Sequence, residues 1–200
     1  MMTVHRNGLR LAGVTLVHMP RVIGLSGKKR HGKDTLGAQL VAEGGYRRVA
    51  FADALYREVS ELTGVSVSVL QDAANKERAM RELGGKSPRQ FLQEHGMRRR
   101  EDDEDHWVNQ VDNMVCGEPQ ARFVITDVRL PNEARWAERH GILVRVMRPG
   151  CPATDTHISE MALDDWPFQY KVLNVEGQSQ KMLSSLLAML ERAQTEAFCG

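Results

Sequence analysis

The chain has 200 residues, 42% of them hydrophobic, and a formal net charge of +1. This length suffices for one compact domain, and no Pro/Gly/Ser-rich linker divides the chain, so we expect residues 19–200 to form a single domain. The near-neutral charge argues against a nucleic-acid partner, and the basic clusters are interpreted as local sites for small anions. The three cysteines are odd in number and far apart, which fits neither a disulfide framework nor a zinc site and predicts a reducing cytoplasm.

Residues 1–18 form an extension before the first clear strand. Its apolar stretch from Leu9 to Met19 is short and is interrupted by Arg10, Gly13 and His18, so it does not predict a membrane span. It also lacks the continuous apolar segment and cleavage site of a signal peptide. Three interpretations stay open for these residues: an edge strand, a disordered tail, or a product of upstream translation initiation.

Residues 22–40 run from an apolar strand through a glycine-bounded loop into a helix. Gly27, Gly32 and Lys33 have the spacing G-x-x-x-x-G-K. In such a loop the backbone N–H groups converge on phosphate oxygens while the lysine reaches the terminal phosphoryl group. The following helix, expected over 33–43, adds the anion preference of its N-terminus. We therefore predict a phosphate-binding loop with Lys33 as a catalytic residue.

The loop departs from the usual pattern after Lys33, where Asp34 stands in place of Ser or Thr and Thr35 follows. Magnesium takes oxygen ligands, so either residue can hold it. Alternatively, Asp34 only stabilises the first turn of the helix, by roughly 0.3–1 kcal/mol. The basic run Lys28, Lys29 and Arg30 suits a polyanion, although solvated surface is an alternative for part of it.

The middle of the chain alternates strand and helix patterns. Residues 46–51 predict a strand with Asp53 at its exit, and 54–62, 67–83 and 88–96 predict helices. The charged segment 97–108 has two interpretations: a solvated loop or helix rim, or a site where one or two of its arginines bind an anionic substrate.

The apolar strand expected over 122–126 ends in Asp127. Ligands bind at the carboxyl edge of parallel α/β sheets, so Asp127 is expected to face the phosphates. Val128 and Arg129 follow, where a hydrolysing enzyme commonly carries a glutamate that activates water. The absence of that base favours transfer to a bound acceptor over hydrolysis, and the absence of an N-K-x-D motif argues against a GTPase.

The last third of the chain predicts a helix over 131–141 and a strand over 142–147. Arg148 emerges from that strand, where it can reach a transferred phosphoryl group. Residues 149–169 contain three prolines and predict a lid outside the core. A final strand over 170–175 and a helix over 178–195 complete an α/β fold with a parallel sheet.

Several motifs together resemble the bacteriophage deoxynucleoside monophosphate kinases. The likeness covers about residues 20–190, and D-V-R-x-P-N-E followed by H-x-S-E is its most specific part. Animal phosphomevalonate kinase shares the G-K-D loop and a similar S-E segment, and is the nearest competitor. The motifs are the loop at 27–35, FADAL at 51–55, R-x-x-x-Q-x-x-G at 89–96, ITDVRLPNEA at 125–134, RPG at 148–150, HISE at 157–160 and LNVEG at 173–177.

The resemblance implies a three-layer P-loop nucleoside monophosphate kinase fold. It also implies ATP and Mg²⁺ as cofactors, transfer of the γ-phosphoryl group to a deoxynucleoside monophosphate for phage DNA synthesis in the host cytoplasm, and allows a homodimer. Met97 replaces the threonine expected after Gly96, which leaves the local alignment open. The residues implied on the acceptor side are Asp53, Arg89, Gln93, Arg99, Asp127 and Arg129.

Two other functions remain as alternatives. One is a different small-molecule P-loop kinase, such as a phosphomevalonate kinase-like enzyme, because both acceptors present an anion. The other is a P-loop ATPase or nucleotide-sensing module, which would turn over or bind ATP without an acceptor. Turnover that requires a monophosphate acceptor would distinguish the first class from the second.

Overall fold

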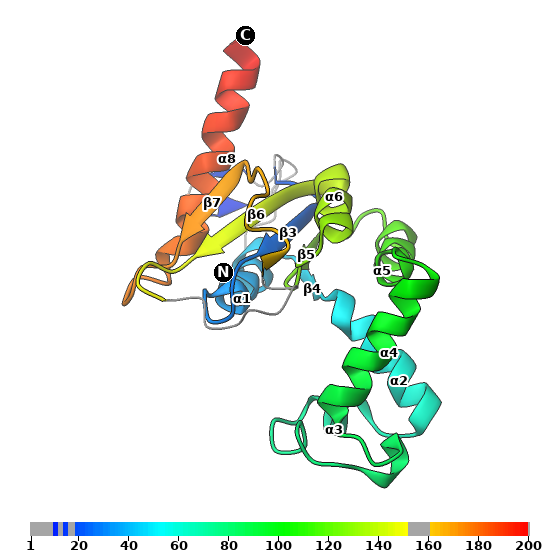
Figure 1. Cartoon of the computed structure of the whole chain (residues 1–200). Coiled ribbons are helices and arrows are strands. Elements are labelled where there is room, and N and C mark those ends of the chain that lie inside the picture. The colour runs from blue at the N-terminus through cyan, green and yellow to red at the C-terminus, as the bar shows by residue number, and fades with distance from the viewer. Residues whose placement is uncertain (1–9, 12–13, 16–18, 152–160, 200) are drawn as a thin grey trace. The chain divides into compact units, whose positions relative to one another are not determined.

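The computed structural model of the chain describes residues 10–11, 14–15, 19–151 and 161–199, and the chain divides into two compact units (Figure 1). The sheet unit comprises Met1–Val49 and Gln120–Gly200, and the helical unit comprises Ala50–Pro119. A single domain over residues 19–200 stays a prediction. Among the described residues, no helix has the length and apolar character needed to cross a membrane.

The sheet unit is built on five strands in the spatial order β4-β5-β3-β6-β7, and every neighbouring pair is parallel. Val22 on the central strand pairs with Phe123 on one side and with Gly141 on the other. The α/β fold with a parallel sheet is therefore confirmed. The strands are β3 (Val22–Ser26), β4 (Arg47–Val49), β5 (Phe123–Ile125), β6 (Gly141–Met147) and β7 (Tyr170–Leu173).

Helices cover both faces of this sheet, which makes three layers. On one face, α1 (Lys33–Gly44) and α8 (Lys181–Cys199) pack leucines such as Leu36, Leu40 and Leu186 into the main core. On the other face lies α6 (Pro131–His140), so close that a Cβ on Gly24 would lie 2.7 Å from Ala137 Cβ. Each fully buried leucine contributes roughly 1.5–3 kcal/mol.

The central strand shows why the sequence reads as continuously apolar there. All five residues of β3 are buried. Successive side chains alternate between the two faces, so Ile23 and Leu25 enter the core under α1 and α8 while Gly24 faces α6. A strand covered on both faces has no polar side, as expected for a parallel sheet.

The helical unit has its own core, formed by Val59, Val65, Leu70, Leu83 and Leu92. The buried Trp107 joins two of its helices by donating from Nε1 to Gly96 O at 3.3 Å. Its elements are α2 (Phe51–Thr63), α3 (Val67–Gln71), the 3-10 helix η2 (Arg81–Leu83), α4 (Pro88–Asp102) and α5 (His106–Gly117).

Three expected boundaries in this unit were wrong. The helix over 67–83 is reduced to α3 and η2, because the Asp72 carboxylate accepts from Ala74 N and Asn75 Nδ2 and forms a turn instead. Helix α2 begins at Phe51, so Asp53 lies in its first turn. Helix α4 continues past Gly96 to Asp102, and the chain packs closely at this glycine, where an added Cβ would lie 3.3 Å from Leu55 Cδ2.

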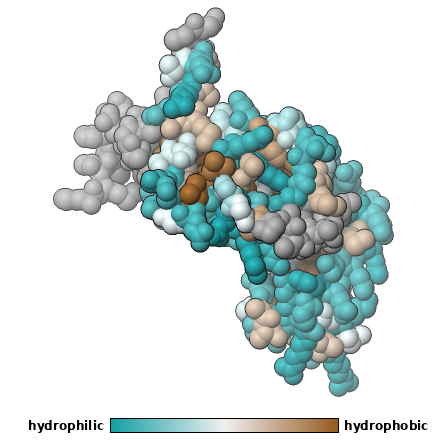
Figure 2. Space-filling view, turned by 60° about the vertical axis from the view of Figure 1, so that its left-hand side comes forward, coloured by the Kyte–Doolittle hydropathy of each residue, from teal (hydrophilic) through white to brown (hydrophobic). Residues whose placement is uncertain are grey.

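Two features lie away from the main sheet or at its edge. Arg10–Leu11 (β1) pairs antiparallel with Val14–Thr15 (β2) in a separate two-stranded ladder. Beside the N-terminal end of α8, apolar side chains are surrounded by polar surface (Figure 2). The exposed Leu173 belongs to the edge strand β7. Lys171 on that strand disfavours pairing with another chain.

Candidate phosphate-binding site

The candidate site lies at the carboxyl ends of the parallel strands of the sheet unit. The loop of Gly27–Gly32 follows β3, Asp127 follows β5, Arg148 follows β6 and Asn174 follows β7. All these strands are parallel, so the residues that follow them come to the same edge of the sheet, which is the edge where such sheets bind ligands.

Glycines at both ends of the loop are required by close approaches. Gly27 has φ +152°, and a Cβ there would lie 2.4 Å from Val146 O. Gly32 has φ +102°, and its Cβ would lie 2.4 Å from Asn174 Nδ2. Between them Arg30 adopts φ +66°, and His31 N donates to Lys28 O at 3.2 Å. The loop therefore wraps back on itself between the two glycines.

Lys33 begins α1 and reaches back to the start of the loop. Its Nζ donates to Gly27 O and, at 3.1 Å, to Lys28 O, and the residue is only 8% exposed. The N-cap of α1, Gly32, provides no side-chain cap. A cation and the N-terminus of a helix thus meet at the loop, and both favour an anion there.

Asp34 and Thr35 occupy the first turn of α1, and both side chains are exposed. Their oxygens suit magnesium, which prefers oxygen ligands. His31, within the loop, has both ring nitrogens buried without a hydrogen-bond partner in the described part of the chain. Lys29 and Arg30 are exposed on the loop.

The structure adds Arg145 and Asp164, which sequence reasoning missed. The Asp164 carboxylate accepts from Lys28 Nζ at 2.5 Å and from Arg145 Nη2 at 2.9 Å. Burial raises the pKa of Asp164, but hydrogen bonds and charge from Lys28 and Arg145 outweigh it and lower that pKa. Arg145 Nη1 also donates to Ser26 Oγ at 3.1 Å. A single arginine in the apolar strand 141–147 was the available signal.

Arg148 follows the end of β6 and is half-buried, and its Nη2 lies 3.8 Å from Glu176 Oε1. Asp127 is half-buried, and Arg129 is exposed. The buried Glu133 in the same motif serves α6, because its carboxylate accepts from the main-chain N of Arg129 at 2.8 Å and of Leu130 at 3.0 Å. Part of the expected lid, residues 152–160, including the H-x-S-E motif, lies outside the described residues.

Four of the expected acceptor residues belong to the helical unit. Asp53 accepts from Ala50 N at 2.9 Å and closes the capping box of α2. Arg89 and Gln93 are exposed one turn apart on α4, and Arg89 pairs with Glu77 at 3.1 Å. Arg99 donates from Nε to Glu58 Oε1 at 2.6 Å. A role for these residues in binding the acceptor stays a prediction.

Glu58 gathers side chains from two other helices of the unit. Besides Arg99 it contacts His95 Nε2 at 2.7 Å and His106 Nε2 at 3.1 Å. Burial raises its pKa, but the three hydrogen bonds and the charge of Arg99 outweigh burial and lower the pKa of Glu58 from 4.5 to about 2. The ionised carboxylate therefore ties α2, α4 and α5 together.

This pKa predicts a dependence of stability on pH. Glu58 becomes protonated near pH 4.5 in the unfolded chain and only near pH 2 in the folded chain. The stability that the ionised Glu58 carboxylate contributes is therefore complete above pH 4.5 and is lost as pH falls towards 2. Between about pH 5 and pH 3, wild type should lose more thermal stability than Glu58→Gln. The control is Glu94→Gln, which removes an exposed carboxylate and should follow wild type; equal losses in all three proteins would contradict the prediction.

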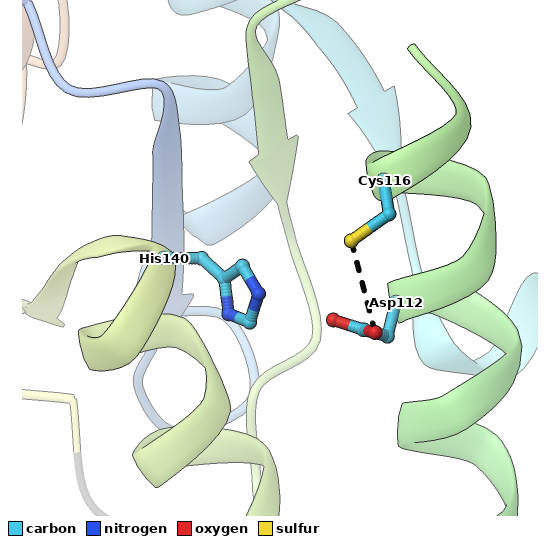
Figure 3. A group of neighbouring side chains, drawn as sticks. All are labelled: Asp112, Cys116 and His140. Atoms are coloured by element: carbon cyan, nitrogen blue, oxygen red, sulfur yellow. Dashed lines mark hydrogen bonds between the residues drawn. The ribbon is translucent and has the colours of Figure 1, made fainter. Parts of the chain in front are cut away.

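Figure 3 shows three further side chains with metal-ligating atoms. Asp112 and Cys116 lie one turn apart on α5, where Sγ donates to Asp112 Oδ2 at 3.8 Å. His140 ends α6 of the sheet unit, where its ring stacks on Trp136 at 4.6 Å. Each has a partner within its own unit, and we assign them no metal.

The parallel sheet with helices on both faces, together with the glycine-bounded loop, defines an α/β protein with a P-loop nucleoside monophosphate kinase-like fold. Over 157 residues the chain is 32% identical to a protein of Acanthamoeba polyphaga mimivirus named "Putative deoxynucleotide monophosphate kinase", covering 71% of this chain and 81% of the viral protein. The chain belongs to the deoxynucleotide monophosphate kinase family.

Other comparisons add little to this assignment. No protein-family model matches the chain. A solved structure described as "Crystal structure of TT1252 from Thermus thermophilus" is 19% identical with a TM-score of 0.45, covering 90% of this chain and 97% of that one. A likeness at that level carries no argument about function.

Proposed function

We propose that the protein is an ATP-dependent kinase that transfers the γ-phosphoryl group of ATP to a deoxynucleoside monophosphate. The observation that carries this proposal is the loop of residues 27–33, in which the Lys33 ammonium is held over the loop carbonyls at the N-terminus of α1. The family relationship supports transfer as the reaction. In a phage-infected cell the product would supply DNA synthesis in the host cytoplasm.

In this proposal the sheet unit binds ATP. The loop N–H groups and Lys33 contact its phosphates, and Lys33 stabilises the charge that develops during transfer. Lys28, which pairs with Asp164, is proposed to contact the same polyanion at the start of the loop. Arg148 is proposed to engage the transferring group from the end of β6.

Polar residues of each unit, taken separately, are proposed for a role in acceptor binding. Asp127 and Arg129 follow β5, and Arg89 and Gln93 share an exposed face of α4. The guanidinium of Arg89 suits a monophosphate, since arginine binds phosphate oxygens in a forked geometry. Asp53 and Arg99 complete the proposed set, and base preference would follow from contacts beyond the phosphate.

Magnesium fits the first turn of α1, where an exposed carboxylate and an exposed hydroxyl lie at adjacent positions beside the loop. Asp34 or Thr35 would hold the ion, which neutralises phosphate charge when bound. The donor set consists of oxygens, as magnesium requires.

Asp34→Asn is expected to raise the magnesium concentration needed for half-maximal turnover severalfold, because it keeps the size and one oxygen but removes the charge. The measurement is a magnesium titration at saturating substrates, with thermal melts alongside. If Asp34→Asn melts lower yet keeps the wild-type magnesium requirement, the carboxylate serves only the helix turn, and Thr35→Val becomes the variant to titrate.

The test of the proposed function is ADP release from ATP against a panel of deoxynucleoside and ribonucleoside monophosphates, with phosphomevalonate and dephospho-coenzyme A included. The proposal predicts release only when a deoxynucleoside monophosphate is present. Release with phosphomevalonate alone would indicate the competing kinase class, and release without any acceptor would indicate an ATPase.

A further inference from the structure

Asn174 connects the end of β7 to the phosphate-binding loop. Its main-chain N donates to Met147 O at 2.7 Å, which fixes its position beside the end of β6. Its side chain is buried, and Nδ2 donates to His31 O at 3.0 Å. The neighbouring Gly32 approaches so closely that a Cβ would lie 2.4 Å from Nδ2. The amide therefore packs directly against the His31–Gly32 peptide.

This contact determines the direction of one peptide in the loop. The described residues contain no cis peptide, and in a trans peptide the C=O and the N–H point in opposite directions. When Asn174 holds His31 O, the Gly32 N–H is turned away from Asn174. That N–H has no hydrogen-bond partner among the residues that the structure describes.

The φ angle of Gly32 allows the His31–Gly32 peptide to adopt more than one orientation. With φ +102°, Gly32 has a freedom that residues with a Cβ lack, so its preceding peptide could rotate without a side-chain clash. The hydrogen bond from a buried amide opposes that rotation. A peptide that is already held in its binding orientation before the ligand arrives loses less conformational freedom on binding, so binding costs less free energy.

We propose that Asn174 is a positioning residue, which holds the His31–Gly32 peptide with its N–H directed at a phosphate of bound ATP. This inference rests on the proposed function, since it requires ATP to bind at the loop. Asn174 contributes through its donor: an aspartate of the same shape has no proton to donate when ionised, and it repels the carbonyl.

Two substitutions separate this role from general packing. Asn174→Ala removes the donor at every pH, and it should weaken ATP binding about fivefold to tenfold, the size of one hydrogen bond. Asn174→Asp should bind ATP as weakly at pH 8. Burial raises the pKa of an aspartic acid, so its protonated carboxyl regains a donor as pH falls, and affinity should recover towards wild type near pH 5.

The experiment measures the Kd of ATP by calorimetry for wild type and both variants between pH 5 and pH 8, with each variant expressed as a ratio to wild type at the same pH. The control is Tyr46→Phe, which removes another hydrogen bond from a buried side chain to a main-chain carbonyl, Tyr46 OH to Pro20 O at 2.5 Å. It should lower the melting temperature without changing the Kd.

The expected result is a constant ratio for Asn174→Ala and a ratio that approaches one at low pH for Asn174→Asp. Wild-type affinity in both variants, or a ratio for Asn174→Asp that does not change with pH, would overturn the positioning role alone. A wild-type protein that binds no ATP would overturn the proposed function and this inference together.

Discussion

Lys33→Ala should lower phosphoryl transfer by about a hundredfold to a thousandfold, the loss typical of removing one group that stabilises transition-state charge. The Lys33 ammonium lies against the carbonyls of Gly27 and Lys28 at the start of the loop. Its removal therefore takes away the positive charge that α1 brings to the loop. The measurement is kcat at saturating ATP and acceptor. The Lys33→Ala variant should keep its fold, because the Lys33 side chain lies at the start of a helix beside the loop and does not belong to the apolar core.

The control for that variant is Lys181→Ala, which removes an exposed lysine at the start of α8 and should leave kcat unchanged. Circular dichroism and thermal melts establish that each variant is folded. A folded Lys33→Ala enzyme with a near-normal rate would refute the assignment of the loop as the catalytic phosphate site.

Gly141→Ala is expected to destabilise the sheet unit by about 3 kcal/mol or more, at the upper end of the cost of overpacking. Gly141 pairs with Val22 at the start of β6, and a Cβ there would lie 2.0 Å from Val22 O and 2.9 Å from Val22 C. These atoms are main chain of the central strand, so they cannot move aside as a side chain would. Urea denaturation gives the free energy of unfolding.

The matched control is Gly117→Ala at the end of α5, where no atom lies within 4 Å of the added Cβ. This variant should stay within about 0.5 kcal/mol of wild type, as is usual for surface changes. If the two alanine variants had equal free energies of unfolding, the close approach of β3 and β6 at Gly141 would be wrong.

The elements around the phosphate loop were predictable because their signals are local. The apolar run before Gly27, the spacing to Gly32 and Lys33, and the stop at Gly44 lie within one short segment, and β3 and α1 follow them closely. Parallel pairing also followed from the alternation of strand and helix patterns. The predicted roles of Asp34, Asp127 and Arg148 await experiment.

What the sequence could not supply depends on contacts between distant residues. Asp164 meets Lys28 across 136 positions, and Asn174 meets His31 across 143, so neither contact has a local pattern. Local competition explains the shortened helix after Gln71, where the Asp72 side chain forms a turn. Arg99 was expected either in a solvated rim or at the substrate, and its ion pair was not foreseen because its partner Glu58 lies 41 positions away on another helix.

Whether this protein phosphorylates deoxynucleoside monophosphates is measured by transfer of label from ATP carrying a radioactive γ-phosphate. The protein, magnesium and a set of deoxynucleoside monophosphates are incubated together, and the labelled products are separated by chromatography. Wild type is expected to form a labelled deoxynucleoside diphosphate, and Lys33→Ala is expected not to. Label released only as inorganic phosphate, at the same rate with and without an acceptor, would contradict this expectation.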